Sequence, residues 1–296
     1  MASKLSQQLF VNLGCGSRFH PDWMNFDIEP FAPGVLQADL SKGIPLPDAV
    51  CDVVYHSAVL EHIRREDAAA FLAECFRVLR PGGLIRVAVP DFERICIQYL
   101  QKLDRAAAGD ESAARDYEWM LIEAFDQMVR ERSGGEMLSY LRRTPLLNEA
   151  FVLERIGEEG RELLAMIRGE TPAIRRPITL ARLAKKTARV AGAARRALAG
   201  LFLTRHERRA LRVGRFRLGG EVHQWVYDRY SLGRVLREAG FVDPQVNTAT
   251  SSGISGWAGY SLDALPGGEA IKPDLFYMEA TRPVGGGPDR SRHPAI

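Results

Sequence analysis

The fold is decided by a short stretch near the start of the chain, Leu9-Phe10-Val11-Asn12-Leu13-Gly14-Cys15-Gly16-Ser17. Its apolar first half is typical of a central strand of a parallel sheet that is covered on both faces. Gly14 and Gly16 then predict a tight turn, because glycine lets backbone N–H groups approach a ligand with no Cβ in the way. Open α/β sheets bind ligands at the carboxyl end of such a strand. The stretch therefore predicts a site for a nucleotide-like ligand.

Asp27 indicates which nucleotide-like ligand is excluded. It ends a second short strand, expected over 24–28, and follows Gly16 by eleven positions. A dinucleotide fold places its ribose-binding acid about 20 residues on and needs a third glycine, whereas Phe19 occupies that position here. NAD and FAD are therefore a poor fit, although the Asp27 carboxylate can still accept two hydrogen bonds from a ribose diol.

Strands and helices alternate through the first 90 residues. Further strands are expected over 35–40, 50–57 and 84–90, and residues 71–79 have the apolar spacing of a helix. The sequence Arg80-Pro81-Gly82-Gly83 ends that helix, because proline cannot continue it and glycine suits its end. Later segments predict a helix from Ser231 and strands over 241–246 and 275–280. The alternation predicts a mainly parallel sheet.

With these motifs in order, the chain resembles the class I S-adenosylmethionine-dependent methyltransferases, of the type 11-like group. The resemblance is carried by N-L-G-C-G at 12–16, F-D-I at 26–28, A-D-L at 38–40, D-V-V-Y-H-S-A-V-L-E-H-I at 52–63 and V-L-R-P-G-G-L-I-R-V-A-V-P-D at 78–91. It covers residues 9–92 and resumes at 223–241 and 275–280. It implies an α/β fold, Rossmann-like and doubly wound, with a mainly parallel seven-stranded sheet and a helical insertion after the fifth strand.

The resemblance also implies the cofactor, S-adenosylmethionine, and its product, S-adenosylhomocysteine. The glycine turn would pass under the methionine part, Asp27 would hold the ribose hydroxyls, and Ser57 would lie near the sulfonium. Asp39 and Leu40 would flank the adenine. The residues expected at the cofactor are Leu13, Gly14, Cys15, Gly16, Asp27, Ile28, Asp39, Leu40 and Ser57.

The chain departs from the family pattern at two positions of the glycine turn. Asn12 replaces an acid that is often found two positions before the first glycine, and Ser17 stands where a third glycine is common. These departures put in question how the chain binds the methionine amino group, and they leave the expected fold unchanged.

Composition sets the outer bounds. The chain has 296 residues, 46% of them hydrophobic, and no apolar run approaches the roughly 20 residues that cross a bilayer. The N-terminus runs almost directly into the first expected strand, so we expect no signal peptide and a cytoplasmic protein. The four cysteines, at positions 15, 51, 75 and 96, lack C-x-x-C spacing and are expected to be reduced core residues.

The strand–helix rhythm disappears after about residue 93 and returns near 220. We expect a cofactor-binding domain over 1–103 and 219–283, a helical cap over 104–218 above the active site, and a disordered tail over 284–296. A long insertion of this kind is usually functional. The alternative is a peripheral helical decoration that does not contact substrate.

Positive charge is concentrated in one part of the cap. Residues 175–217 contain fourteen lysines and arginines and one acid, a formal charge of +13, so the rest of the chain carries −10 against a total of +3. Basic residues interleaved with apolar ones can lie on an anionic membrane or bind a lipid-linked anionic substrate. A solvated face packed on the acidic remainder is one alternative, and contact with nucleic acid is another.

His223 and His62 are the candidate catalytic bases. An imidazole that titrates near neutral pH can take a proton from a substrate hydroxyl, and His223 lies in a segment expected at the rim of the active site. Trp225 and Tyr227 follow it and are expected to bind substrate, because either ring can form a wall against a flat sugar face. The alternative for His223 is a hydrogen-bonded structural role.

Glu61 and Arg130 are the remaining substrate-binding candidates. Glu61 and His62 could also bind a metal, but adjacent helix positions point about 100° apart, so we expect no metal. Arg130 follows Asp126 by four positions on one expected helix. The alternative for Asp126 and Arg130 is an ion pair with each other along the helix.

The sequence thus predicts an S-adenosylmethionine-dependent methyltransferase that methylates an oxygen of a small molecule or saccharide, such as a cell-surface glycan precursor. A nucleic-acid methyltransferase and a non-catalytic S-adenosylmethionine-binding protein are the alternatives. Nucleic acid is disfavoured because Val89-Pro90-Asp91 stands where many base-amino methyltransferases of this superfamily carry N-P-P-[YF].

Overall fold

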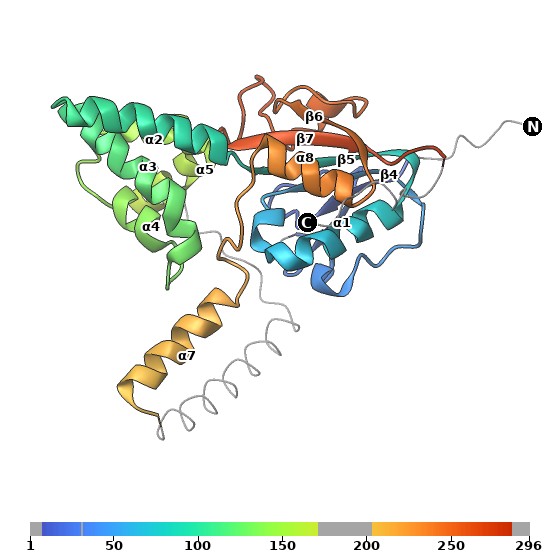
Figure 1. The fold of residues 1–296 in the computed structure, drawn as a ribbon, viewed down its shortest axis with the longest axis horizontal. Coiled ribbons are helices and arrows are strands. Elements are labelled where there is room, and N and C mark those ends of the chain that lie inside the picture. The colour runs from blue at the N-terminus through green and yellow to red at the C-terminus, as the bar shows by residue number, and fades with distance from the viewer. Residues whose placement is uncertain (1–7, 31, 171–202, 286–296) are drawn as a thin grey trace, which may run out of the picture.

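The computed structural model describes residues 8–30, 32–170 and 203–285 (Figure 1). Its centre is one seven-stranded sheet in the order β3-β2-β1-β4-β5-β7-β6. The strands are β1 (Phe10–Leu13), β2 (Met24–Asp27), β3 (Val35–Gln37), β4 (Cys51–Ser57), β5 (Leu79–Pro90), β6 (Val242–Asn247) and β7 (Leu275–Thr281).

The sheet is mainly parallel. Strands β3, β2, β1, β4 and β5 pair in parallel, whereas β7 runs antiparallel to both β5 and β6. All four residues of β1 are buried, and Val11 and Leu13 are completely inaccessible. A strand that is buried on both faces is what the continuous apolar run predicted. The expected fold class is confirmed.

Two apolar layers cover the sheet. On one face α1 (Arg65–Val78) and α8 (Arg229–Glu238) pack over the strands (Figure 1), and Leu72, Val78 and Leu236 are completely buried there. On the other face an aromatic group that includes Trp23 and Trp257 packs against β1 and β4; Trp257 belongs to the one-turn helix α9 (Trp257–Tyr260). The sheet therefore has no bare face near its centre, and the carboxyl ends of its strands stay open for a site.

Local chemistry shifts some expected boundaries. Helix α1 begins at Arg65 and ends at Val78, and β5 starts directly after it, at Leu79. Helix α8 is capped by Asp228, whose carboxylate accepts hydrogen bonds from the backbone N–H groups of Tyr230 and Ser231. The helix therefore begins two residues before Ser231, where the sequence predicted its start, because the Asp228 carboxylate can reach those N–H groups.

The segment after β5 is helical. It contains α2 (Phe92–Ala107), α3 (Glu111–Val129), α4 (Gly135–Leu141) and α5 (Glu149–Arg168), which share an apolar core centred on Trp119, Met120 and Val152. Helix α2 runs from the end of β5 past residue 103, so the expected domain boundary falls inside a helix. The domain limits themselves stay a prediction.

Helix α7 (Arg205–Arg217) extends away from the rest of the structure (Figure 1), and none of its residues is buried. It is the described part of the basic segment. Residues 175–202 of that segment lie outside the described residues, as does the expected tail beyond 285. No helix among the described ranges combines the length and apolar character that crossing a membrane requires.

Candidate active site

The glycine turn follows β1 with both glycines at positive φ, +64° for Gly14 and +51° for Gly16. A Cβ on Gly14 would come within 2.6 Å of Val59 Cγ2, so this position cannot hold a side chain without movement. A Cβ on Gly16 would meet nothing within 4 Å, so the backbone at this position is open. The turn is therefore a cradle of exposed backbone beside free space.

Asp27 lies against this turn. Its carboxylate accepts hydrogen bonds from the backbone N–H groups of Gly16 and Glu29, each at 2.8 Å. Its own carbonyl accepts from Ala38 N–H at 2.9 Å, which ties the ends of β2 and β3 together. A carboxylate oxygen with one such bond keeps acceptor capacity. The acid and the turn thus form one unit at the carboxyl ends of the parallel strands.

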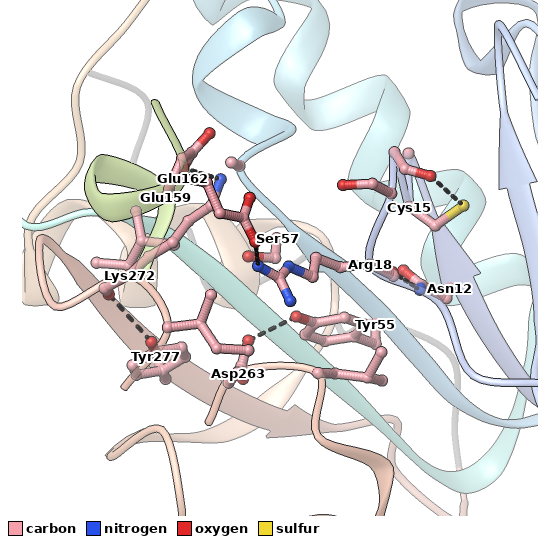
Figure 2. Close-up of a pocket in the computed structure, with 17 residues that line it drawn as sticks. Asn12, Cys15, Arg18, Tyr55, Ser57, Glu159, Glu162, Asp263, Lys272 and Tyr277 are labelled. Carbon is pink, nitrogen blue, oxygen red and sulfur yellow. Dashed lines mark hydrogen bonds and ion pairs between the residues drawn. The ribbon is translucent and has the colours of Figure 1, made fainter. Parts of the chain in front are cut away.

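A cavity of about 270 Å³ opens beside the turn (Figure 2). Its floor comes from the turn and from Ser57 at the end of β4, and its far wall from Asp263, Lys272 and Tyr277. Helix α5 contributes Glu159 and Glu162 from the cap.

Two ion pairs join the cap to the sheet domain across the cavity. Arg18, in the loop after the glycine turn, pairs with Glu162 at 2.8 Å, and the Lys272 ammonium pairs with Glu159 at 3.0 Å. Figure 2 shows the Arg18 side chain running from the turn toward the carboxylate of Glu162. Two acidic side chains of α5, Glu159 and Glu162, therefore contact basic side chains at the edge of the cavity.

The structure divides the expected cofactor residues into two groups. Gly14, Cys15, Gly16 and Ser57 line the cavity, and Leu13 lies buried behind the turn. The others lie outside the cavity, on the ends of β2 and β3 and in the loops that follow: Asp27, Ile28, Asp39 and Leu40.

The outer group is partly exposed. The Ile28 side chain is 62% exposed. The Asp39 carboxylate caps the short 3₁₀ helix η1 (Leu40–Lys42) by accepting from Ser41 N–H. Leu40 lines a separate hollow with Val59 and His62. The cavity therefore covers only the inner part of the expected cofactor site.

Cys15 is an inert thiol. Burial, together with the charge of Asp27, raises its pKa to about 12, so the sulfur stays protonated at neutral pH. A protonated, buried thiol is a poor nucleophile. The residue contributes its backbone to the turn, where its N–H donates to the carbonyl of Phe26 at 3.1 Å.

Beyond Ser57 the chain forms a second polar cluster, in which Glu61, His62 and His223 meet. Glu61 and His62 lie in the 3₁₀ helix η2 (Leu60–His62). The backbone N–H groups of Gln224 and Trp225 both donate to the carbonyl of Glu61, at 2.6 and 3.2 Å. This contact brings the His223 ring to 4.7 Å from the His62 ring, centroid to centroid. The two expected catalytic histidines are therefore neighbours.

Burial controls the protonation of this cluster. It raises the pKa of the Glu61 carboxyl to about 8 and lowers the pKa of His223 to about 3. The neighbouring ring of His62 and the charges of Arg130 and Lys272 depress the pKa of His223 further. Burial also lowers the pKa of His62. Both imidazoles are therefore neutral near pH 7.

The aromatic candidates after His223 occupy different environments. The Trp225 ring is half-buried, with the Arg65 guanidinium 4.5 Å from its centroid. Tyr227 is 2% exposed and packs in the main core, so the expectation that its ring forms a wall against a substrate is wrong. Its hydroxyl is buried and has no hydrogen-bond partner in the described part of the chain. Burial and the nearby Glu61 raise its pKa to about 12.

Arg130 pairs with a residue other than the one expected. Its guanidinium lies 3.4 Å from the carboxylate of Glu221 and donates to Gln127 at 2.9 Å. The Asp126 carboxylate instead accepts from the backbone N–H groups of Glu136 and Met137 at the start of α4. The expectation of an ion pair between Asp126 and Arg130 is wrong. The N–H groups at the start of α4 have no partner within their own helix, and they donate to the Asp126 carboxylate instead.

Sequence reasoning missed the far wall of the cavity. Asp263 accepts a hydrogen bond from the Tyr55 hydroxyl at 2.5 Å and from Arg86 at 2.8 Å, and both Arg86 and Asp263 are buried. Tyr55 lies within the D-V-V-Y motif, where strand alternation alone could have marked it as facing away from the α1 side. No local signal marks Asp263 or Lys272, because both lie in an irregular segment between β6 and β7.

Fold and site together define an open α/β protein with a cavity at the carboxyl ends of its parallel strands, next to a glycine turn. Proteins of this architecture usually bind their ligands there. Comparison with known proteins then shows a family match over part of the chain. Residues 12–87 match the family model described as "Methyltransferase domain". The resemblance to class I S-adenosylmethionine-dependent methyltransferases is confirmed, and residues 12–87 form a domain of this class.

The matching relatives share short segments with the chain. A probable S-adenosylmethionine-dependent methyltransferase of Mycolicibacterium smegmatis is 54% identical over 48 residues, which are 16% of this chain and 18% of that protein. One from Mycobacterium tuberculosis is 49% identical over 57 residues, 19% of this chain and 20% of that protein. The chain thus covers about a fifth of the length of these curated relatives.

A solved structure is similar over a longer span but at low identity. The S-adenosylmethionine-dependent methyltransferase from Mesorhizobium loti aligns with 95% of this chain and 94% of its own. The two sequences are 14% identical, and the TM-score is 0.35.

Proposed function

We propose that this chain is an S-adenosylmethionine-dependent methyltransferase that methylates an oxygen of a small molecule or saccharide. The observation that carries the proposal is the 2.8 Å hydrogen bond from Gly16 N–H to the Asp27 carboxylate, at the edge of the cavity. This bond joins the open glycine backbone to the carboxylate that we propose binds the ribose. The methyltransferase domain match over residues 12–87 includes both groups.

The residues present fit this cofactor. The open face of Gly16 can accommodate the methionine chain, and the remaining lone pairs of the Asp27 carboxylate can accept from the ribose hydroxyls. The exposed Ile28 side chain offers an apolar surface for the adenine face. When bound, the cofactor supplies an electrophilic methyl group. The chain must then hold an acceptor atom in line with that methyl group and exclude water.

The two neutral histidines support an oxygen acceptor. A hydroxyl is a better nucleophile when a base accepts its proton, and a neutral imidazole has a lone pair for this purpose. The Nδ1 atom of His62 is buried and has no hydrogen-bond partner among the described residues. We propose that His62 takes the proton of the acceptor hydroxyl and that His223 assists it.

The acceptor would bind between the cap and the sheet domain. We propose Glu61, Arg130 and Trp225 as its contacts. Tyr227 is not among them, because its ring is enclosed in the core. Trp225 has an apolar ring at the surface of the 221–227 segment, which suits a sugar face. The Arg130 side chain is only 9% exposed, and its Nε has no hydrogen-bond partner among the described residues, so it can bind an oxygen of the acceptor.

Calorimetric titration with S-adenosylmethionine and S-adenosylhomocysteine tests the cofactor assignment. Asp27→Ala should weaken both affinities by about tenfold or more, because a hydrogen bond to a charged group contributes about 1.5–3 kcal/mol. Asp22→Asn is the matched control, since Asp22 is an exposed acid before β2 that lies outside the cavity. Equal affinities of wild type and Asp27→Ala would refute the assignment.

We also propose that the chain is cytoplasmic and that its basic segment touches anionic membrane. Support comes from α7, whose arginines lie on a helix with no buried residue. Wild-type protein should sediment with vesicles that contain anionic lipid and not with neutral vesicles. Replacing Arg212, Arg215 and Arg217 by glutamine should reduce sedimentation, whereas Arg142→Gln, an exposed arginine of the cap, should not. Unchanged sedimentation of the triple variant would contradict the proposal.

A further inference from the structure

We propose that Glu61, His62 and His223 form a binding site for one divalent transition-metal ion of the kind that imidazole nitrogen and carboxylate oxygen bind together, such as Zn²⁺. The site uses the same His62 Nδ1 atom as the base proposed above, so a bound ion and the proton-acceptor role of His62 exclude each other. Metal binding itself is measured without methyl transfer. Two histidines and one carboxylate are a donor set that suits zinc and iron.

The three side chains already converge. One ligand atom from each lies within 4.8 Å of the other two. Donor atoms bound to zinc lie about 2.0–2.2 Å from the ion, so two of them are separated by roughly 3–4 Å. The His62 and His223 rings stand at 87° to each other. Small side-chain rotations are therefore enough to direct all three donor atoms at one point.

The carboxylate of this cluster has no internal partner. Glu61 is 1% exposed, and neither of its oxygens has a hydrogen-bond partner among the described residues. Buried polar atoms are nearly always paired, and an unpaired one requires an explanation such as an ion. A cation bound by both oxygens or by one of them would supply the missing interaction.

His62 keeps one ring nitrogen without a partner. Its Nδ1 is buried and has no hydrogen-bond partner in the described structure. A neutral imidazole carries a lone pair on one of its two ring nitrogens, and that lone pair can bind a metal ion. An ion at this place would give the buried Nδ1 atom a partner.

Backbone contacts fix the three residues in place. The carbonyl of Glu61 accepts from Gln224 and Trp225, and the His223 N–H donates to the carbonyl of Gln127 in α3 at 3.0 Å. The site is therefore built where η2, the 221–227 segment and the cap meet. A ligand set on separate, mutually bonded elements is preorganised for an ion.

Two cations near the cluster oppose a bound metal, and each has a counter-charge. Arg130 lies near Glu221, and the Lys272 ammonium pairs with Glu159 at 3.0 Å. Because both cations have acidic partners, neither needs the Glu61 carboxylate as a counter-charge. Glu61 is the one acid among the three proposed ligands, and a single carboxylate suits one divalent ion rather than a cluster of ions.

The first experiment uses the wild-type chain after chelator treatment. Equilibrium dialysis against buffered Zn²⁺ should give one tightly bound ion per chain. X-ray absorption of the loaded protein should show only nitrogen and oxygen donors near 2.0–2.1 Å, including two imidazoles, and no sulfur near 2.3 Å. Binding well below one ion per chain, or a sulfur shell that assigns the ion to cysteine, would overturn the proposal.

The second experiment compares variants by dialysis and by the visible spectrum of bound Co²⁺. Glu61→Gln, His62→Ala and His223→Ala should each weaken Zn²⁺ binding by at least about 100-fold. The control is His206→Ala, which removes an exposed histidine on α7 and should not change the affinity. Equal affinity of wild type and the three variants would overturn the proposal. The wild-type absorption experiment remains decisive if a variant fails to fold.

Discussion

Arg18 and Glu162 form an ion pair of 2.8 Å that joins the loop after the glycine turn to helix α5 of the cap. Arg18 lies only two residues after Gly16, so the pair connects α5 to the segment that we propose holds the cofactor. The pair therefore couples the position of the cap to the cavity.

Glu162→Gln should open this side of the cap without unfolding the protein. The two side chains are 36% and 59% exposed, so their loss should cost less than about 1 kcal/mol of unfolding free energy. Amide hydrogen exchange in α5 should nevertheless become faster. Glu158→Gln is the control, since Glu158 pairs with Arg161 in the same helix but does not line the cavity. Identical exchange in both variants would show that the pair does not hold the cap.

The two turn glycines should differ in their tolerance of alanine. Gly14→Ala places a Cβ 2.6 Å from Val59 at positive φ, so it should lower the free energy of unfolding by about 1–3 kcal/mol. Gly16→Ala meets no atom within 4 Å, so it should cost less stability but weaken S-adenosylmethionine binding by filling the cradle. Urea unfolding and calorimetry measure the two effects. Equal stability losses would contradict the packing argument.

Glu74 should make stability depend on pH in acid. Hydrogen bonds from Arg77, with help from Ile44 N–H, lower the pKa of Glu74 from its ordinary 4.5 to about 2. A depressed folded-state pKa stabilises the protein above the unfolded pKa, and this contribution is lost as pH falls from about 4.5 to about 2. Its size should be about 1–2 kcal/mol, because the side chain is 31% exposed and screened.

Glu74→Gln should therefore flatten the loss of stability below pH 4.5, as measured by urea unfolding from pH 7 to pH 3. Glu66→Gln removes an exposed acid from the same helix and should leave the profile unchanged. The variant should also loosen residues 43–48, because Glu74 holds Arg77 in place. The Arg77 guanidinium in turn donates to the carbonyls of Ile44 and Leu46 and to the Asp48 carboxylate. A profile that matches the wild type would show that Glu74 does not contribute.

Short sequence spacings predicted three residues that the structure brings to one cavity. Gly14, Gly16 and Ser57 each sit at the end of a strand whose apolar run is visible in the sequence, and parallel pairing brings those ends together. The far wall could not be predicted, because Asp263 and Lys272 reach the cavity from an irregular segment about 200 residues later. No periodicity or turn signal encodes such a long-range approach.

The histidine cluster shows the same limit. The sequence predicts that Glu61 and His62 are a poor metal pair because neighbouring helix residues diverge, and that prediction considers two residues only. The third residue, His223, arrives 161 positions later through backbone bonds from Gln224 and Trp225 to Glu61. Tertiary contact, which the sequence does not display, turns two diverging side chains into part of a convergent set.

The buried Arg86 network should dominate the stability of the far wall. The Arg86 guanidinium is completely buried and donates to Asp263 and to Glu279, at 2.8 and 2.7 Å. Asp263→Asn leaves part of that charge unpaired, so it should lower the free energy of unfolding by about 3–5 kcal/mol. Asp52→Asn removes the partner of Arg80 in a pair that is 38% and 24% exposed, and it should cost about 1 kcal/mol. Urea unfolding at pH 7 compares them, and equal losses would mean that the buried pair is not special.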